Sequence, residues 1–400
     1  MNLWVLNHYA GTSDTTQATR SFDLSKGLVK RGHSVTIFAS SFSEYKFIEM
    51  RLKPSDKWKV EYSDGVRFVW LKTAPYRGNN WRRILNILSY TWRSFWVGTG
   101  IKQKPDAIIG VSVHPLAAFS AWALSFLKNS RFFFEITDLW PQVLIEVGRL
   151  STKNPVTLAL RALEKFLFGK AEKIIAYWPH VDDYIEKVGV SGQKFIWIPH
   201  LADFSRYKDL TPYDGAQSED FTIMFLGRHG KWNSLDTILK GAKILQDEGA
   251  NNSKFVLVGD GPEKPNLVKL VKELGLYNVE FRDAVPKHQI SKIMSEADAF
   301  IDCYKNAPLM QYGISTNKLC DYLASGRPTL FGGSPKMNPV KEAKAGITFP
   351  AENPRALAES VKKLVALTPE ERMQMGVNGL TYVKKHHDIQ ILTDRLEGLL

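Results

Sequence analysis

The chain has little cysteine: Cys303 and Cys320 are its only two in 400 residues. Two cysteines do not build the disulfide framework of a small secreted domain. Both lie in apolar strand or helix patterns, so we expect packed thiols and a reducing, cytoplasmic setting. The first residues, Met1–Leu6, lack a basic segment and a small-residue cleavage site, so they predict no secretory signal peptide.

Long uncharged runs are also scarce. The run 107–127 contains no Asp, Glu, Lys or Arg and is long enough to span a bilayer. However, His114 and Pro115 interrupt it. The first half reads as a buried strand over 107–113, and the second half reads as a helix that starts beside Pro115. We therefore expect a strand, a turn and a helix here, and no membrane span.

The composition is that of a folded protein, with 24% charged and 44% hydrophobic residues. A chain of 400 residues predicts two or three domains with ample core. The formal net charge of +12 points to polyanionic partners, which include nucleic acid, acidic lipid and phosphorylated ligands. The first strand is not followed by G-x-G-x-x-G, which argues against the dinucleotide-binding fingerprint.

Short apolar strands alternate with helical patterns along the whole chain, which predicts an α/β fold with parallel sheets. One series of strands runs from residue 3 to residue 199, and a second begins at residue 221. The stretch 201–220 between them is polar, turn-rich and poorly periodic. We therefore place the domain boundary there and expect domains over 1–200 and 201–384, followed by a last helix within 385–400.

The stretch 312–328 is a short predicted helix with an unusual start. Ser315 or Thr316 can cap it, and Gly326 with Pro328 ends it. A helix start favours an anion, whereas a cation in the first turn, here Lys318, disfavours the helix itself. We therefore expect Lys318 to meet an anionic ligand rather than to serve local stability. Asp321, one turn further on, is placed to accept the hydroxyls of a ribose. The alternative is an ordinary helix with a solvated lysine.

A second anion site is expected after the strand that ends in Gly227. The loop there carries Arg228 and Lys231 just before a helix start. Because this loop and the start of the helix after Thr316 both follow strands of one parallel sheet, we expect the two sites to share one diphosphate.

The segment 76–96 contains no acidic residue and mixes arginine with aromatic residues on a helical pattern. A basic amphipathic helix with aromatic side chains suits the surface of an anionic bilayer. The alternative is a core helix with solvated arginines. The residues that we expect at the membrane are Trp81, Arg82, Arg83, Trp92 and Trp96.

Several motifs in this order resemble the retaining glycosyltransferases of family four, which have the GT-B fold. They are Arg31–Thr36, Val258–Pro262, Val279–Phe281, Val285–Pro286 and Glu296–Phe300. The resemblance implies two Rossmann-like domains that face a deep cleft. The first would bind the acceptor and the second the nucleotide sugar, and the C-terminal helix would cross back to pack on the first.

Within the family, the stretches 313–328 and 135–141 look most like transferases of O-antigen and capsule synthesis, such as the N-acetylfucosaminyl type. This implies transfer of an N-acetylated sugar from a UDP-sugar to a polyprenyl-diphosphate-linked sugar. Two departures are visible. The first of the family's two glutamates falls on Gly313, and the second matches Asp321; the usual lysine falls on Asn233, with Lys231 close by.

The resemblance also suggests roles for single residues. His114 would orient the sugar or donate to it, Asp138 would serve the acceptor, and Arg20 and Trp140 would contact the acceptor; His114 can also be simply a cap beside Pro115, and Trp140 can simply pack. The chain has no D-x-D triplet, so we expect no metal and no cofactor, with helix amides and cations stabilising the leaving diphosphate. The expected donor-binding residues are Gly11, Thr12, Gly227, Arg228, Lys231, Gly259, Arg282, Ala284, Ser315, Thr316, Asn317, Lys318 and Asp321.

These features predict a cytoplasmic enzyme, peripheral on the inner membrane, whose partners are a UDP-sugar, a lipid-linked acceptor and an anionic lipid surface. Two alternatives remain. A UDP-sugar 2-epimerase has the same architecture and would form an epimer without any acceptor. A nucleic-acid-binding protein would explain the charge, but the basic aromatic segment matches no recognised module, and helix-start anion sites suit small phosphates better.

Overall fold

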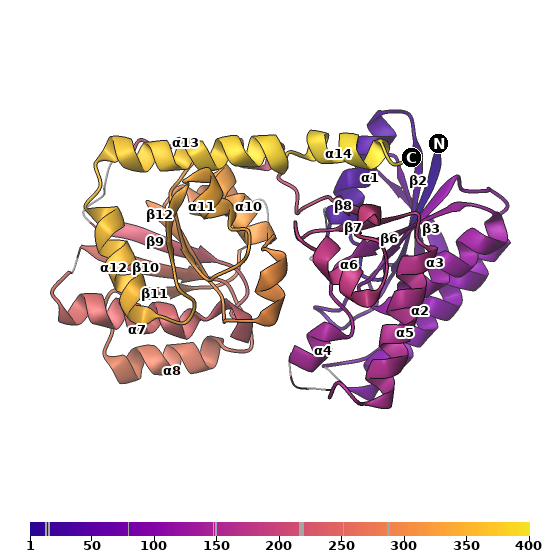
Figure 1. The fold of residues 1–400 in the computed structure, drawn as a ribbon, viewed down its shortest axis with the longest axis horizontal. Coiled ribbons are helices and arrows are strands. Elements are labelled where there is room, and N and C mark those ends of the chain that lie inside the picture. The colour runs from indigo at the N-terminus through magenta and orange to yellow at the C-terminus, as the bar shows by residue number, and fades with distance from the viewer. Residues whose placement is uncertain are drawn as a thin grey trace. The chain divides into compact units, whose positions relative to one another are not determined.

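The computed structural model describes residues 1–12, 14, 17–78, 80–146, 148, 150–215, 220–250, 252–285 and 289–400. The chain divides into two compact units. Unit 1 comprises Met1–Pro199 together with Ile389–Leu400, and unit 2 comprises His200–Asp388. Each unit is one predominantly parallel sheet covered by helices (Figure 1).

The sheet of unit 1 has the strand order β3-β4-β2-β1-β5-β6-β7-β8. Every neighbouring pair is parallel except β3 and β4, which form an antiparallel edge. The parallel core confirms the α/β expectation. The strands are β1 (Asn2–Leu6), β2 (Ser34–Ser40), β3 (Trp58–Ser63), β4 (Val66–Leu71), β5 (Ala107–Val111), β6 (Arg131–Ile136), β7 (Lys173–Ala176) and β8 (Phe195–Trp197).

The helices of unit 1 include one from the far end of the chain. Helix α14 lies against α1, where Arg31 pairs with Glu397 at 2.7 Å. The C-terminal segment therefore completes unit 1. The helices are α1 (Arg20–Lys30), α2 (Trp81–Gly100), α3 (Pro115–Lys128), α4 (Gln142–Glu146), α5 (Pro155–Lys170), α6 (Asp182–Val188) and α14 (Ile389–Glu397).

The uncharged run 107–127 folds as predicted, into β5 and α3. His114 caps α3, because its Nδ1 accepts a hydrogen bond from the amide of Ala117 at 3.1 Å. Gly110 lets the helix approach the strand, since a Cβ there would lie 2.9 Å from Cα of Ala118. Within the described ranges, none of the helices combines the length and apolarity needed to cross a bilayer.

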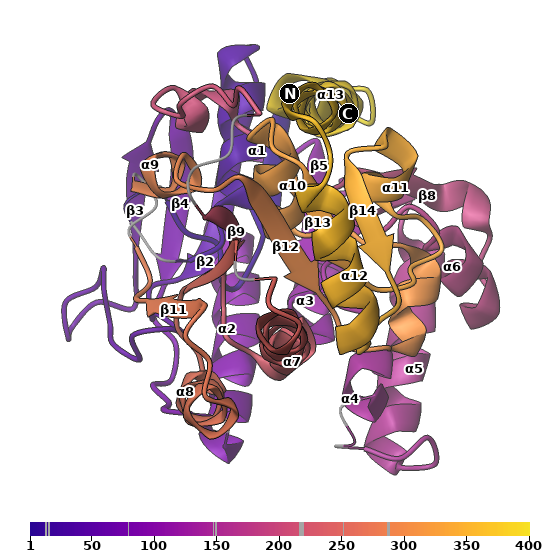
Figure 2. The same ribbon diagram turned by 90° about the vertical axis from the view of Figure 1, so that its left-hand side faces the viewer.

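The sheet of unit 2 has the order β11-β10-β9-β12-β13-β14, and all neighbouring pairs are parallel. Figure 2 shows α7 and α12 side by side, and the two helices contact each other. The strands are β9 (Phe221–Leu226), β10 (Ser253–Val258), β11 (Val279–Arg282), β12 (Ala299–Cys303), β13 (Thr329–Gly332) and β14 (Gly346–Phe349). The helices are α7 (Leu235–Asp247), α8 (Lys264–Leu274), α9 (Ile290–Met294), α10 (Asn317–Ala324), α11 (Pro339–Ala343), α12 (Pro354–Val365) and α13 (Pro369–His386).

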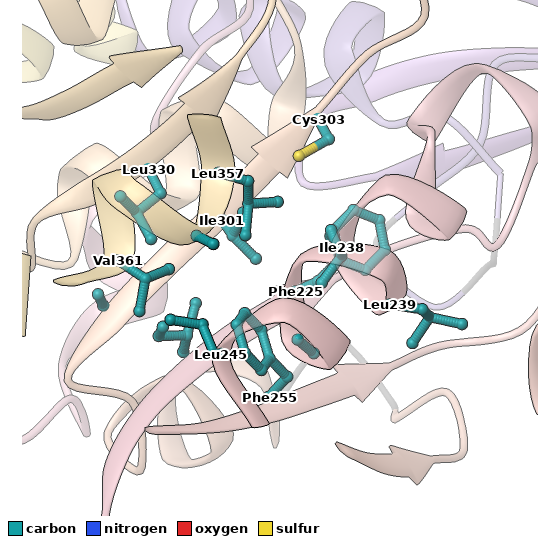
Figure 3. Close-up of a cluster of buried hydrophobic side chains, with 14 of the residues drawn as sticks. Phe225, Ile238, Leu239, Leu245, Phe255, Ile301, Cys303, Leu330, Leu357 and Val361 are labelled. Atoms are coloured by element: carbon teal, nitrogen blue, oxygen red, sulfur yellow. The ribbon is translucent and has the colours of Figure 1, made fainter. Parts of the chain in front are cut away.

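The main core of unit 2 lies between this sheet and the helices α7 and α12 (Figure 3). Phe225 and Phe255 come from the strands, Ile238 from α7, and Leu357 and Val361 from α12. All are almost completely buried. This apolar layer holds α7 and α12 against one face of the sheet.

Helix α10 is the predicted short helix, and Thr316 is its cap. The Thr316 hydroxyl accepts a hydrogen bond from the amide of Leu319 at 3.3 Å. Ser315, the other candidate, instead accepts from the amide of His200 at 3.1 Å. Gly326 follows with φ 72°, the left-handed conformation that ends helices. Pro286, part of the Val285–Pro286 motif named above, lies outside the described residues.

Candidate active site

The predicted donor-binding residues of unit 2 lie at one edge of its sheet. Because all six strands are parallel, their carboxyl ends meet at the same edge, where ligands of open α/β sheets bind. Gly227 follows β9, Gly259 follows β10, Arg282 ends β11, and Ala284 lies just beyond it. The chain leaving β12 leads through the short 3-10 helix Pro308–Tyr312 to α10.

Lys318, in the first turn of α10, joins three of these segments. Its Nζ lies 2.6 Å from Oδ1 of Asp302 at the end of β12, and 2.8 Å from Oδ1 of Asn233 in the loop after β9. Its stem lies against Gly227, where an added Cβ would be 2.6 Å from Cδ of Lys318. The Lys318 ammonium also lies 4.6 Å from the ring centre of Phe225.

These contacts correct one premise about Lys318. The sequence predicts that the charge of Lys318 serves an anionic ligand and does not stabilise the protein itself. Instead, the fully buried carboxylate of Asp302 supplies the anion from within the unit. Burial raises the pKa of Asp302, while Lys318 and the Tyr304 hydroxyl act in the opposite direction. Lys318 therefore has a structural reason to be there, whatever else it binds.

The cap of α10 is tied to the same network. The Tyr304 hydroxyl donates to Oδ2 of Asp302 at 2.7 Å and lies 3.2 Å from Oγ1 of Thr316. Asn317, the next residue, is exposed. The start of α10 is thus held to the end of β12 by a tyrosine and a carboxylate.

The loop after β9 is held close to the loop after β10. A Cβ on Gly259 would lie 1.9 Å from the carbonyl oxygen of Gly227, so only glycine fits. The amide of His229 donates to the carbonyl of Asp260 at 2.9 Å. Arg228 and Lys231 are both exposed at this loop, as a ligand-binding role requires.

Arg282 is placed differently from our expectation. Its guanidinium pairs with Glu280 at 2.6 Å and with Glu296 at 2.5 Å. The hydrogen bonds from Arg282 and Lys254 lower the pKa of Glu280 to about 2. The side chain of Arg282 is therefore engaged in the protein, and its carbonyl accepts the amide of Gly259 at 3.1 Å. Ala284 is exposed in the loop that follows.

Asp321, the expected ribose ligand, accepts a hydrogen bond from the Tyr207 hydroxyl at 2.5 Å. Tyr207 lies in the short 3-10 helix Phe204–Tyr207. This contact fixes one carboxylate oxygen of Asp321. Tyr207 carries no sequence signal for such a role, because it lies in the irregular stretch that follows the first series of strands.

His229 is a residue that our sequence reasoning did not single out. Its side chain is fully buried, and neither ring nitrogen has a hydrogen-bond partner among the described residues. Burial, with a smaller contribution from Lys264, lowers the pKa of His229 to about 4. The imidazole packs against Phe281, with ring centres 5.8 Å apart. His229 is therefore a neutral, buried side chain that packs beneath the loop after β9.

In unit 1, His114 lies at the carboxyl end of β5, next to the end of β1. Its Nε2 lies 2.8 Å from Nδ1 of His8, a residue we did not predict. Both rings are buried, and His114 is 3% exposed. Burial, with a contribution from Arg83, lowers the pKa of His114 to about 3. Since Nδ1 caps α3, both ring nitrogens of His114 have partners within unit 1.

Asp138 and Trp140 follow β6 at the same edge. Asp138 is an exposed residue by surface area, but the protein atoms around its carboxyl group raise the pKa of Asp138 to about 6, against the charge of Arg83. Trp140 is half-buried, and its Nε1 has no hydrogen-bond partner in the described part of the chain. Both residues line a small cavity of about 10 Å³, enough for one water molecule, together with Ser112 and Glu164.

Arg20, expected to contact the acceptor, is buried and bonded within unit 1. Its Nε pairs with Glu135 at 3.0 Å, Nη2 donates to the carbonyl of Ile198 at 2.7 Å, and Nη1 donates to the carbonyl of Pro199. These contacts give Arg20 an internal role, namely holding the end of β6 to the chain beyond β8.

Gly11 and Thr12 lie in the loop after β1 and are buried. The amide of Gly11 donates to the carbonyl of Ala18 at 3.0 Å, which closes the loop. The Thr12 hydroxyl bonds to Asp14 and accepts from Arg51 at 2.8 Å. Gly11 and Thr12 are therefore held in place by contacts with Ala18, Asp14 and Arg51.

Helix α2 exposes its apolar side chains and buries its polar ones. The buried residues of α2 are spaced four apart and are Asn86, Tyr90, Ser94 and Gly98. Exposed are Trp81 at 65%, Trp92 at 66%, and Ile84, Leu85, Leu88 and Trp96. The expected membrane residues Trp81, Arg82, Trp92 and Trp96 therefore reach solvent.

Arg83 does not share this exposed face. It is half-buried and interacts with the hydroxyls of Tyr9 and Tyr76, and its charge acts on His8 and His114. We expected it at a membrane, and this placement contradicts that expectation. The physical reason is helical geometry: Arg83 precedes Asn86 and Tyr90 by three and seven residues, so it belongs to the inward face.

Comparison with known proteins identifies the family to which the two units belong. Residues 15–200 match the "Glycosyl transferase 4-like domain" family, and residues 220–366 match "Glycosyl transferases group 1". The proposed colanic acid biosynthesis glycosyl transferase WcaI of Escherichia coli (strain K12) is 22% identical over 348 residues, covering 83% of this chain and 81% of that protein.

Two solved structures show the same fold over the whole chain. Sucrose-phosphate synthase from Thermosynechococcus elongatus superposes with a TM-score of 0.77 at 15% identity, covering 100% of this chain and 98% of that one. Anabaena Alr3699/HepE, solved in complex with UDP-glucose, superposes with a TM-score of 0.70 at 13% identity, covering 100% and 99%. The two sheets with their helices are thus the GT-B fold, and the chain belongs to the group 1 glycosyltransferases, the nucleotide-sugar-dependent enzymes of family four.

Proposed function

We propose that this enzyme moves an N-acetylated sugar from a UDP-sugar to a polyprenyl-diphosphate-linked sugar at the inner membrane surface, in the synthesis of a bacterial surface polysaccharide such as O-antigen or capsule. WcaI, the relative named for colanic acid biosynthesis, supports the polysaccharide assignment, and HepE, solved with UDP-glucose, supports the UDP-sugar. The transfer retains the anomeric configuration and needs no metal.

The observation that carries the donor part is the position of Lys318 at the start of α10. An ammonium has three N–H groups, and two of them meet Asp302 and Asn233. We assign the third to a phosphate oxygen of the donor. The amides at the start of α10, with Arg228 and Lys231, complete the diphosphate site, and Asp321 binds the ribose.

These groups also explain how the reaction would proceed without a metal. Negative charge develops on the diphosphate as the glycosidic bond breaks, so fixed cations and helix amides stabilise the transition state more than the ground state. The acceptor hydroxyl then attacks from the face that the diphosphate leaves. Asp138 serves the acceptor hydroxyl, and Trp140 stacks on a sugar ring.

The membrane part rests on three helices of unit 1 that expose large apolar side chains. Helices α2, α3 and α5 lie next to one another (Figure 1). Helix α5 buries Thr157 and Glu164 together with the apolar Leu167 and Phe168. Phe126 of α3 is 76% exposed and Leu127 58%, and α5 exposes Val156, Leu158 and Phe166. Apolar surface of this extent on a folded unit marks a contact with a partner or a membrane.

The charge of these helices supports an anionic bilayer as the partner. Besides the inward-facing Arg83, the helices α2, α3 and α5 carry Arg82, Arg93, Lys128, Arg161, Lys165 and Lys170, and their one acidic residue is Glu164. Glu164 is buried, so every charged side chain that these three helices expose is basic. Basic side chains around exposed tryptophan and phenylalanine are typical of helices that lie in a lipid interface.

Vesicle flotation tests this surface. We expect binding to vesicles that contain anionic lipid, weaker binding to neutral vesicles, and loss of binding in the variant Trp92→Gln with Trp96→Gln. The matched control is Tyr62→Gln, an aromatic residue that is 69% exposed on β3. Unchanged flotation of the double variant would remove the membrane assignment.

Product analysis tests the transfer itself. The protein is incubated with a panel of UDP-sugars and with a polyprenyl-diphosphate-linked N-acetylsugar, and the lipid product is detected by mass spectrometry. We expect a product one sugar larger, with the anomeric configuration retained. An epimerised UDP-sugar in the absence of acceptor would favour the epimerase reading, and no turnover with any UDP-sugar would contradict the proposal.

A further inference from the structure

The imidazoles of His8 and His114 form a pair at the carboxyl ends of two neighbouring strands. Strands β1 and β5 are adjacent and parallel, and His8 and His114 follow them. Nδ1 of His8 lies 2.8 Å from Nε2 of His114, and the ring planes are 88° apart. Both side chains are almost completely buried. The pair therefore makes one short hydrogen bond away from bulk water.

The direction of this hydrogen bond follows from the cap of α3. A backbone amide can only donate, so Nδ1 of His114 is the acceptor in its bond with Ala117. In a neutral imidazole one nitrogen accepts and the other carries the proton, so the His114 proton is on Nε2. His114 Nε2–H then donates to Nδ1 of His8. By the same reasoning, the proton of His8 is on its own Nε2.

His8 is held by aromatic rings on both sides. It stacks on Tyr9 with ring centres 4.3 Å apart, and on Tyr90 of α2 with centres 4.2 Å apart and planes 9° from parallel. The Tyr90 hydroxyl donates to the carbonyl of Phe38 at 2.8 Å, which anchors that ring in turn. The orientation of the His8 ring is thus set by packing, independently of His114.

Asn86 of α2 is a polar neighbour of His8 that is held by contacts of its own. Its Nδ2 donates to Oγ1 of Thr73 at 2.8 Å and to the carbonyl of Ala74 at 2.7 Å. Oδ1 of Asn86 and Nε2 of His8 are both buried without a hydrogen-bond partner among the described residues. Asn86 nevertheless acts on the pKa of His8 in the direction that favours a proton on that ring.

The surroundings keep both rings neutral. Burial and the charge of Arg83 lower the pKa of His8 and of His114, and the His114 ring lowers the pKa of His8 further. The titratable groups that face the pair are Arg83 and Tyr90 from α2 and Tyr9 from the end of β1. A second proton would place two N–H groups against each other at 2.8 Å, so the pair stays neutral through the physiological pH range.

We propose that His8 is a positioning residue for His114. It holds the His114 ring in one orientation and accepts the Nε2 proton until a ligand oxygen takes its place, so His114 meets the ligand as a neutral donor and not as a general base. This rests on the proposed function, in which His114 lies beside the transferred sugar. No tautomer change is needed when the ligand replaces His8.

Nitrogen-15 NMR of the imidazoles in the ligand-free protein tests the pair directly. We expect one proton that is bonded to Nε2 of His114 and shows a scalar coupling to Nδ1 of His8 across the hydrogen bond, unchanged between pH 6 and pH 8. An unprotonated Nε2 of His114, or a proton without that coupling, would overturn the proposal. This measurement needs no turnover, so it stands even if the transfer reaction is not found.

Two substitutions of His8 separate positioning from simple packing. His8→Phe keeps an aromatic ring between Tyr9 and Tyr90 but removes the acceptor, and His8→Asn puts an amide oxygen near the position of Nδ1. We expect His8→Phe to lower kcat by roughly tenfold, because His114 is then misplaced, and to leave the affinity for UDP unchanged. We expect His8→Asn to restore much of the lost kcat. Equal kcat in wild type and His8→Phe would overturn the proposal.

Discussion

At the scale of single residues, Lys318 is the side chain on which donor binding depends most. It has two functions that can be separated, since it pairs with buried Asp302 and we propose that it binds the diphosphate. Lys318→Gln should weaken UDP binding by about tenfold or more, equal to about 1.4 kcal/mol, but leave the affinity for uridine unchanged. Calorimetric titration with UDP and uridine measures both affinities.

The matched control for this prediction is Lys269→Gln, an exposed lysine on α8. Removing Lys318 also leaves Asp302 buried without its cation, which destabilises unit 2. The double variant Lys318→Gln with Asp302→Asn should recover stability without recovering UDP affinity. An equal loss of affinity for UDP and uridine would instead mean that Lys318 acts only through the fold.

Glu164 should make stability depend on pH. Burial raises its pKa to about 8, from 4.5, with Tyr184 and Arg161 opposing the shift. Glu164 ionises in the unfolded chain above about pH 4.5 but in the folded protein only near pH 8. The free energy of unfolding is therefore fully retained below about pH 4.5 and falls as the pH rises through 8. Glu164→Gln cannot ionise, so relative to wild type it should gain stability between pH 5 and pH 9, on the order of a few kcal/mol.

Urea unfolding of both proteins at several pH values gives this difference directly. Other titrating groups are common to wild type and Glu164→Gln, so they cancel. A constant difference from pH 5 to pH 9 would show that Glu164 titrates normally in the folded protein.

The sequence indicated which residues lie at the two sheet edges but not what each contacts. Parallel strands bring their carboxyl ends together, so Gly227, Gly259 and Lys318 could be placed on one edge from the pattern alone. The internal partner of Lys318 could not be predicted, because Asp302 is 16 residues away at the end of a buried strand. His8 was missed for the same reason, since its partner His114 is 106 residues away.

At the scale of secondary-structure elements, two helical glycines should respond in opposite ways to alanine. In α13, a Cβ on Gly376 would lie 1.8 Å from the carbonyl oxygen of Gly326, and this backbone cannot move away cheaply. In α5, a Cβ on Gly169 meets no atom within 4 Å. Gly376→Ala should therefore destabilise by about 1–3 kcal/mol, and Gly169→Ala should be neutral or stabilise by up to about 1 kcal/mol.

Chemical denaturation of both glycine variants measures the two changes. If Gly376→Ala were as stable as wild type, α13 would not pack as closely on the turn at Gly326 as described. The pair also tests whether helix propensity or close packing decides at each position, because propensity favours alanine at both.

Most elements could be predicted from local chemistry. Pro115 opens α3, Thr316 caps α10, and Gly326 ends it, all as the sequence indicated. The inward face of α2 was harder to predict, because the buried residues of this helix are mostly polar or small and many of its exposed residues are apolar. Sequence periodicity gives the two faces of such a helix but not which one meets the protein, and so Arg83 was assigned to the wrong face.

At the scale of the whole molecule, the regular alternation of strands and helices was enough to predict two parallel sheets. The antiparallel edge strand β3 has no comparable signal, since its burial alternates weakly and only its pairing with β4 defines it. The GT-B fold came from the ordered motifs and not from periodicity. Which sugar and which acceptor the enzyme uses depends on side chains that the family varies, so fold does not decide it.

Metal removal tests the whole-molecule mechanism. If fixed cations and helix amides stabilise the leaving diphosphate, release of UDP from the donor should proceed at the same rate with excess EDTA as with added Mg²⁺ or Mn²⁺. Loss of at least tenfold in rate with EDTA, restored by a divalent cation, would show that a metal supplies this stabilisation.

The central claim is that the start of α10 and Lys318 bind the diphosphate of the donor. A crystal structure of the protein with UDP, grown in the presence of EDTA, tests it most directly. We predict phosphate oxygens within about 3 Å of Nζ of Lys318 and of the amides in the first turn of α10. A diphosphate bound elsewhere, with Lys318 still bonded only to Asp302 and Asn233, would contradict the account.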